Sequence, residues 1–408
     1  MTRFAIAAVA AGLISAGQVS RPAGTALALV GARIYPAPDA APIDGGVVLL
    51  EGAAIRAVGS RSAVKVPSEA DVIDCTGLFI AAGFQNSHVH FTEPKWVDAA
   101  RQPASKLSSQ LDAMLTRYGF TTVVDTASIL EDTAALRRRI ESGEVGGPRI
   151  FTAGAPLFPK DGIPYYVREN IAPEVAAHWR TADSPSIAAA LVGENVDHGA
   201  DIIKLFTGSW VERGRVLPMP IDVATAAAAE AHRRGRLVFT HASNLAGLEA
   251  ALAARVDVVA HSLDAPGGLT ADHLRRMKAQ NVSLIPTLKL FGTDSNIETI
   301  LAESRDFHRI GGQLLFGTDV GYLTDYDPTR EYELMARAGL TWRDILASLT
   351  ANPAARFGET SRRGRIAAGL DADLVVLGRD PAADARAFAD VRRTIRSGHQ
   401  LYGAGVLH

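Results

Sequence analysis

Eight nearly continuous apolar runs divide the central part of the chain. They cover residues 79–91, 121–127, 149–154, 200–208, 237–243, 256–263, 282–288 and 314–321. Such runs predict parallel strands that are buried on both faces. The segments between them carry helical patterns, for example residues 221–235 before the fifth run. Alternating strands and helices of this number predict an α/β fold with a (β/α)8 barrel of the TIM type over residues 81–357.

Both ends of the chain have a different pattern, of short strand-like segments separated by glycine, proline and aspartate. These segments lie within residues 25–80 and return in residues 364–378 and 391–403. The pattern is typical of a small β unit, and neither end is long enough to close one alone. We therefore predict a composite β-sandwich domain built from residues 25–80 and 358–408.

The first residues have the pattern of an export signal. Arg3 precedes an apolar run over residues 4–17, which ends in the small residues Ser15, Ala16 and Gly17. The run is shorter than the roughly 20 residues that a membrane-spanning helix needs. We expect residues 1–24 to be a signal peptide and connector, cleaved near Gly17, and the protein to be periplasmic or secreted. The alternative is a buried N-terminal helix.

Composition narrows the possible partners. The chain carries 42 basic and 44 acidic side chains, a net charge of −2. This balance argues against nucleic acid and anionic membranes, which bind positively charged surfaces, and favours a small-molecule substrate. Cys75 is the one cysteine, so a disulfide framework and a thiolate zinc cluster are excluded, and we expect it in a core. The composition leaves open whether the protein forms a homo-oligomer.

Polar residues stand at the ends of five predicted strands. His88 and His90 end the first run, and strand alternation places both on the same side, where they can reach one ion. Lys204, His241, His261 and Asp319 occupy corresponding places on the fourth, fifth, sixth and eighth runs. A single strand-end histidine or aspartate usually serves a structural hydrogen bond. The joint placement of six such residues, at the barrel end that carries active sites, predicts a functional centre.

The buried lysine has a chemistry that fits a metal centre. Burial in an apolar strand lowers the pKa of the Lys204 amine, which favours reaction with carbon dioxide to form a carbamate. The two carbamate oxygens can bridge two cations. A pair of divalent ions about 3.5–4 Å apart can hold a hydroxide between them and polarise a carbonyl. Asp319 can accept the proton of the attacking water and pass it to the leaving group.

The sequence around these residues resembles that of the amidohydrolase superfamily of metal-dependent hydrolases. The matching segments are SHVHF, DIIKLF, FTHAS, VVAHS and FGTDVG, with LFIAAGFQNSHVH and GRIAAGLDADLVVL beside them. The resemblance covers almost all of the chain from about Thr25. It implies a binuclear centre with two divalent ions, preferably zinc. One ion would be held by His88, His90 and Asp319, the other by His241 and His261, with N6-carboxylated Lys204 bridging them.

Within the superfamily, the sequence most resembles the imidazolonepropionase-like amidohydrolases and the related Xaa-Pro or Xaa-Arg dipeptidases. Imidazolonepropionases use one metal and have no bridging lysine, so Lys204 argues against that activity. Family dipeptidases often carry a segment rich in glycine and histidine after the third strand. Residues 153–170 occupy this place and contain no histidine, which suggests a different substrate.

Substrate contacts are predicted in the long loop after the third strand. Tyr165, Tyr166 and Arg168 lie there, and aromatic rings and a cation can hold an acyl group and a carboxylate. The alternative for all three is loop packing and surface charge. Asp125 ends the second strand, where it can orient a ligand or serve structural hydrogen bonds.

The function predicted from these features is hydrolysis of an amide C–N bond in a small substrate. Dipeptides, N-acyl amino acids and cyclic amides are the candidates. A lactonase or phosphotriesterase would use the same centre, because the same nucleophile attacks C–O and P–O bonds. A third alternative is a non-catalytic binding or scaffold protein. The complete set of candidate ligands argues against it.

Overall fold

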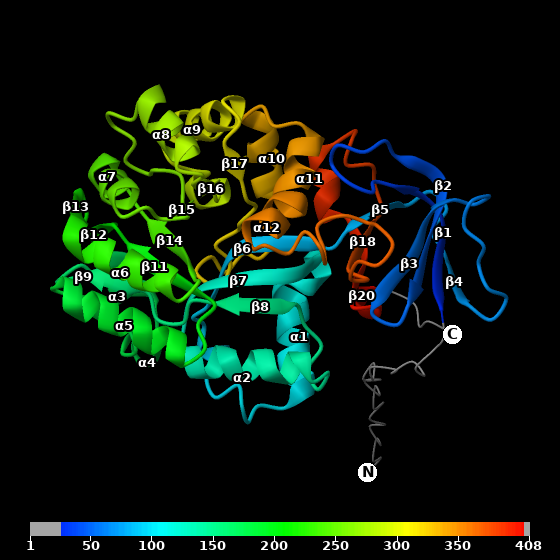
Figure 1. Cartoon of the computed structure of the whole chain (residues 1–408), viewed down its shortest axis with the longest axis horizontal. Helices are drawn as coiled ribbons and strands as arrows, with labels where there is room; N and C mark the ends of the chain where they lie inside the picture. The colour runs from blue at the N-terminus through cyan, green and yellow to red at the C-terminus, as the bar shows by residue number, and fades with distance from the viewer. Residues whose placement is uncertain (1–25, 404–408) are drawn as a thin grey trace, which may run out of the picture.

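The computed structural model describes residues 26–403. It consists of a large body of parallel strands covered by helices, with a mixed β-sheet at one side (Figure 1). The predicted export signal lies outside the described residues.

Two sheets of parallel strands form the centre of the body. The smaller sheet has the order β6-β7-β8, and the larger has the order β10-β9-β11-β14-β15-β16-β17. Each of the eight predicted runs overlaps one of these strands, although the eighth run shares only Leu314 with β17, so the α/β class is confirmed. The bounds are β6 (Phe84–Phe91), β7 (Phe120–Ser128), β8 (Arg149–Thr152), β9 (Leu157–Pro159), β10 (Arg180–Ala182), β11 (Ile202–Phe206), β14 (Leu237–His241), β15 (Val258–Ala260), β16 (Ser283–Ile285) and β17 (Gln313–Leu314).

Backbone hydrogen bonds join the two sheets at two places. The N–H of Ser87 in β6 donates to the carbonyl of Phe316 at 2.7 Å, just after β17. On the other side of the smaller sheet, the N–H of Asp201, just before β11, donates to the carbonyl of Thr152 in β8 at 2.8 Å. The strands do not form one continuous ladder, and the closed eight-stranded barrel therefore stays a prediction.

Helices cover the outer faces of the parallel strands (Figure 1). In α6 the buried Val223, Ala224, Ala227, Ala228 and Ala231 follow the spacing of one helical face. The bounds are α1 (Ala104–Met114), α2 (Leu130–Glu141), α5 (Pro185–Asp197), α6 (Ile221–Arg233), α7 (Leu245–Ala253), α8 (Ala271–Ala279), α9 (Ile297–Arg309), α10 (Thr329–Arg337), α11 (Trp342–Leu349) and α12 (Ala351–Arg356).

Short elements fill the loops around the body. The long connection after β9 contains α3 (Tyr165–Asn170) and α4 (Pro173–Ala176), and a hairpin of β12 (Gly208–Glu212) and β13 (Arg215–Pro218) follows β11. Within residues 26–403, four short 3-10 helices complete the set of elements. They are η1 (Pro94–Trp96), η2 (Thr116–Tyr118), η3 (Leu288–Phe291) and η4 (Ala385–Ala389).

The mixed sheet is built from both ends of the described chain, in the order β20-β19-β18-β5-β1-β2-β3, with β4 paired to β1. Antiparallel pairing of β5 with β18 joins the two chain ends. Cys75 is buried in its core, where burial raises the pKa of the thiol to about 11. The β-sandwich form of this unit stays a prediction. The bounds are β1 (Leu27–Ile34), β2 (Ile43–Glu51), β3 (Ala54–Ser60), β4 (Asp71–Asp74), β5 (Phe79–Ala82), β18 (Leu374–Leu377), β19 (Val391–Arg396) and β20 (His399–Gly403).

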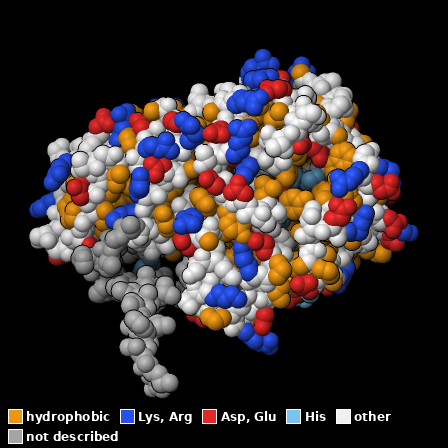
Figure 2. Space-filling model, turned by 180° about the vertical axis from the view of Figure 1, so that it is seen from behind, with side chains coloured by type: hydrophobic (Ala, Val, Ile, Leu, Met, Phe, Trp, Pro, Cys, Tyr) orange, Lys and Arg blue, Asp and Glu red, His pale blue; other side chains and the backbone are white. Residues whose placement is uncertain are grey.

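The surface agrees with the balanced composition. Figure 2 shows basic and acidic side chains interspersed over one face of the molecule, rather than gathered by sign. Within residues 26–403, no helix has both the length and the apolar character needed to cross a membrane.

Two glycines allow the segment after β17 to approach β6 closely. A Cβ on Gly317 would lie 2.8 Å from the Cβ of His88. A Cβ on Gly321 would lie 1.8 Å from the carbonyl oxygen of His90, and this glycine has a φ of +97°. Only glycine fits such a contact in a left-handed conformation. Residues 317–321 therefore lie directly against the strand that carries His88 and His90.

We expect Gly321→Ala to lower the melting temperature more than Gly369→Ala. Both glycines have a positive φ, and an alanine there costs about 1–2 kcal/mol in strain. A Cβ on Gly369 would meet nothing within 4 Å, so only Gly321→Ala must also displace the backbone of His90. Thermal unfolding of the two purified variants measures the difference. Equal decreases would contradict the close contact.

Candidate active site

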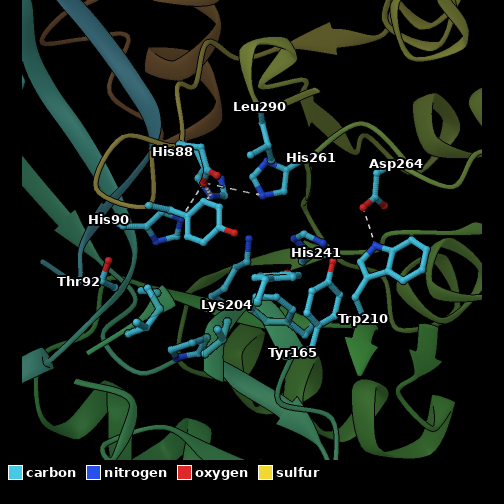
Figure 3. A pocket seen from close by; sticks show the side chains of 18 of the residues that line it. His88, His90, Thr92, Tyr165, Lys204, Trp210, His241, His261, Asp264 and Leu290 are labelled. Carbon is cyan, nitrogen blue, oxygen red and sulfur yellow. Dashed lines mark hydrogen bonds and ion pairs between the residues drawn. The ribbon is translucent and has the colours of Figure 1, made fainter. Parts of the chain in front are cut away.

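Six side chains predicted from strand ends line one cavity at the carboxyl ends of the parallel strands. They come from different elements: β6 supplies two, β11 and β14 one each, and the segments after β15 and β17 the remaining two. Figure 3 shows the labelled histidines and the lysine pointing toward one another. The set is His88, His90, Lys204, His241, His261 and Asp319.

Asp319 is the centre of the histidine contacts. Its Oδ1 lies 2.8 Å from Nε2 of His90 and 3.1 Å from Nε2 of His88. The same oxygen lies 4.0 Å from Nε2 of His261. The backbone N–H of Asp319 donates to the carbonyl of His88 at 3.0 Å, so main chain and side chain both bind the aspartate to β6.

The donor atoms of this cluster fit a divalent cation. The Nε2 atoms of His88 and His90 are 3.2 Å apart, and both lie beside a carboxylate oxygen. Burial, together with the nearby charge of Lys204, holds the pKa of His88 well below its usual range, so its ring is neutral. Nδ1 of His88 is buried without a hydrogen-bond partner among the described residues. Ligand atoms of His88, His261 and Asp319 lie within 4.8 Å of one another, and neutral imidazoles with a carboxylate are typical zinc ligands.

His241 and His261 form a second pair beside this cluster. Their ring centroids are 4.9 Å apart, and the His241 ring stacks on Phe206 at 4.9 Å. Burial is the main cause that holds both pKa values well below the usual range, and the charge of Lys204 lowers them further. Both rings are therefore neutral and keep a lone pair for a metal ion.

Lys204 lies buried among these histidines. Its Nζ is 5.5 Å from the centroid of the Phe206 ring. Burial lowers the pKa of the amine to about 7, and the charge of Asp319 opposes part of this shift. A large share of the amine is therefore uncharged near neutral pH, which is the form that reacts with carbon dioxide. Its carboxylation stays a prediction.

The cavity continues outward between aromatic side chains, with a volume of about 570 Å³. Tyr165 and Tyr166 line it, in the loop where sequence analysis expected them. The centroid of the Tyr166 ring lies 6.4 Å from that of the His241 ring and 5.7 Å from that of the Tyr322 ring. Burial raises the pKa of Tyr166 well above its usual range, so its hydroxyl stays protonated and can donate a hydrogen bond.

Arg168 lies elsewhere than expected. It is not among the residues that line the cavity, and its guanidinium donates to the backbone carbonyls of Ile163 and Val211. Arg213 is the arginine on the cavity wall, 4.9 Å from the Tyr165 ring centroid. Arg168 therefore fastens the loop to the β12–β13 hairpin through these main-chain acceptors and does not line the cavity.

Asp125 has the structural one of its two predicted roles, because it forms hydrogen bonds within the protein. Its carboxylate accepts hydrogen bonds from the hydroxyls of Ser128 and Thr152, both at 2.6 Å. It also accepts from the backbone N–H of Phe91 at 3.2 Å. The fully buried aspartate thereby ties the ends of β6, β7 and β8 together.

Several residues of the cavity wall are not predicted from the sequence. Trp210 in β12 donates from Nε1 to Oδ2 of Asp264 at 2.5 Å, and Figure 3 shows this pair across from His90. Asp264 and Tyr322 each follow a strand-end candidate by three residues, so a search of the segments after the strands would have found them. Trp210 and Phe291 carry no such signal, because they lie on a hairpin and a short helix within loops.

Solved structures of similar fold cover nearly the whole chain. A Xaa-Pro dipeptidase with bound methionine is 20% identical over 93% of this chain and 100% of its own, with a TM-score of 0.79. A putative prolidase from Bifidobacterium longum is 24% identical over 93% and 95%, with a TM-score of 0.76. The ochratoxinase of A. niger is 20% identical over 94% and 97%, also with a TM-score of 0.76. These likenesses show a shared fold.

Comparison by sequence gives the family. No curated protein matches the chain significantly in sequence. The model described as "Amidohydrolase family" matches residues 79–401, which include all six strand-end residues of the cavity. Members of this family are hydrolases that act on carbon–nitrogen bonds, as sequence analysis predicts for this chain. The chain belongs to the amidohydrolase family.

Proposed function

We propose that this amidohydrolase binds two divalent cations, preferably zinc, and cleaves an amide C–N bond in a small substrate. The observation that carries the proposal is the meeting of four histidines, a carboxylate and a buried lysine at one end of the cavity. One ion would be held by His88, His90 and Asp319, and the other by His241 and His261. N6-carboxylated Lys204 would bridge them.

The cations would supply Lewis acidity to the reacting carbonyl and to water. The protein supplies the proton transfer. Oδ1 of Asp319 faces the histidines, which leaves Oδ2 to accept the proton of the attacking water and return it to the leaving nitrogen. The protonated hydroxyl of Tyr166 is a donor for a substrate oxygen, and the buried position of the cluster limits access of bulk water.

The shape and lining of the cavity support a small amide with an apolar group. Its volume of about 570 Å³ lies in the range of sites for small molecules. Tyr165, Trp210, Phe291 and Tyr322 give the outer part an aromatic wall. Structures of similar fold include a Xaa-Pro dipeptidase, a molinate hydrolase and an ochratoxinase, whose names describe different small substrates. Dipeptides, N-acyl amino acids and cyclic amides are therefore the substrates proposed for this chain.

The proposal includes the architecture and location expected from the sequence. The hydrogen bonds from Ser87 to Phe316 and from Asp201 to Thr152 support a closed barrel over residues 81–357. The sheet shared by both chain ends supports a separate β-sandwich unit of residues 25–80 and 358–408. The pattern of residues 1–24 supports export, which would make the enzyme periplasmic or secreted.

We expect Lys204→Ala to lower both the metal content and the activity of the purified protein. Loss of a bridging ligand displaces the ions, and a misplacement of about 1 Å costs roughly 100-fold in rate. Lys106→Ala, at an exposed position of α1, is the matched control and should leave both quantities unchanged. Elemental analysis measures the metal content, and hydrolysis of an amide substrate measures the rate. Wild-type metal content and rate in Lys204→Ala would contradict the bridging role.

Metal removal tests the chemistry as a whole. A chelator should abolish hydrolysis of dipeptides or N-acyl amino acids, and zinc should restore it, because the ligand set alone provides no comparable electrophile. The same protein is then assayed on amides, lactones and phosphotriesters, with the kcat/KM of each compared. Highest kcat/KM on a lactone or phosphotriester would replace the amide proposal, and full activity of metal-free protein would end it.

A further inference from the structure

The side chain of Thr287 lies directly behind one of the proposed metal ligands. Thr287 follows β16 and is fully buried, and its Oγ1 lies 2.5 Å from Nδ1 of His261. The same hydroxyl donates to the carbonyl oxygen of Pro286 at 2.8 Å. The contact is therefore on the ring nitrogen that does not face the cluster, since it is Nε2 of His261 that lies 4.0 Å from Asp319.

The direction of the hydrogen bond follows from the number of protons. A hydroxyl has one hydrogen, and a carbonyl oxygen can only accept. Oγ1 of Thr287 lies within donating distance of the Pro286 carbonyl, so we assign the hydroxyl hydrogen to that acceptor, and Oγ1 then accepts from Nδ1–H of His261. A neutral imidazole carries one N–H, so Nε2 of His261 is left with its lone pair directed at Asp319 and at His88, whose ring lies 4.5 Å away.

Thr287 is itself held in an unusual conformation. Its φ is +46°, in the left-handed region that β-branched residues rarely adopt. The next two residues explain how it persists. The backbone N–H groups of Leu288 and Lys289 donate to the two carboxyl oxygens of Glu331 in α10, at 2.9 and 2.6 Å. Glu331 is fully buried, so this pair of bonds fixes the segment that presents Thr287 to His261.

We propose that Thr287 is a positioning residue, held in place by Glu331, which fixes His261 with its proton on Nδ1 and so presets Nε2 to bind a metal ion. The proposal rests on the proposed function, which makes His261 a metal ligand. Partners on the second ring nitrogen orient metal-binding histidines and raise their basicity, and their loss typically weakens metal affinity about 10- to 100-fold.

The experiment compares zinc affinity in three variants of the full chain. Thr287→Val keeps the shape and removes the hydroxyl, Thr287→Ser keeps the hydroxyl, and Thr225→Val changes an exposed threonine of α6 as the control. Zinc is titrated into metal-free protein in competition with a chromophoric chelator. We expect Thr287→Val to bind zinc about 10- to 100-fold more weakly, and the other two to bind like wild type. Wild-type affinity in a folded Thr287→Val would overturn the proposal.

A second measurement separates this proposal from the proposed function. Long-range proton–nitrogen spectra of metal-free, 15N-labelled protein report which ring nitrogen of His261 carries the proton. We expect Nδ1–H in wild type and a loss of this preference in Thr287→Val, whereas Nε2–H in wild type would overturn the proposal. If wild type binds no zinc, the proposed function fails, and the spectra still decide whether Thr287 sets the proton on His261.

Thermal unfolding of the metal-free variants distinguishes positioning from simple stability. A purely structural role would lower the melting temperature of Thr287→Val and leave its zinc affinity unchanged, which would also overturn the proposal. Glu331→Gln replaces one accepting oxygen with an NH₂ group and should weaken zinc binding in the same direction as Thr287→Val. Glu333→Gln, partly exposed on the same helix, should have no effect.

Discussion

The contact of one buried carboxylate oxygen with three imidazoles is the interaction on which the active site depends. Oδ1 of Asp319 lies within 4.0 Å of Nε2 of His88, His90 and His261, although Asp319, His261 and the histidine pair of β6 are far apart along the chain. Removing so many polar groups from water costs free energy unless each finds a partner. Parallel strands bring their carboxyl ends to one place, and the glycines after β17 let Asp319 approach β6. A cation would be coordinated by the nitrogen and oxygen lone pairs that meet there.

The polar residues at the strand ends could be predicted from the sequence, because their positions depend on local periodicity. Alternation in β6 places His88 and His90 on one side, and the apolar run around Lys204 marks it as buried. The loops could not be predicted in this way. Arg168 was expected in the cavity, yet Arg213 lies there, because the β12–β13 hairpin folds back over α3 and takes up the Arg168 guanidinium. That arrangement depends on contacts between distant segments.

Two buried glutamates form a further layer that the sequence pattern hides. Glu303 and Glu331 lie on helix faces that otherwise pack as apolar surfaces, and burial raises their pKa values to about 8 and about 7. Glu303 accepts from the backbone of Leu263, two residues after His261, at 2.9 Å. Asp125 does the same for the end of β6. Glu303 and Glu331 each hold a loop next to a proposed ligand, so helices on the outside of the body help to determine the geometry at its centre.

The mixed sheet has a consequence for the way the chain reaches its native state. Gly83 alone separates β5 from β6, and β5 pairs with β18, which begins at Leu374. During synthesis on a ribosome, the strand that continues into the first pair of histidines therefore lacks this neighbour until more than 370 residues have been made. Closing so long a loop slows folding, since distant segments must meet before their contacts stabilise the product. Assembly of the mixed sheet is thus a late event, which places its completion after most of the body has emerged.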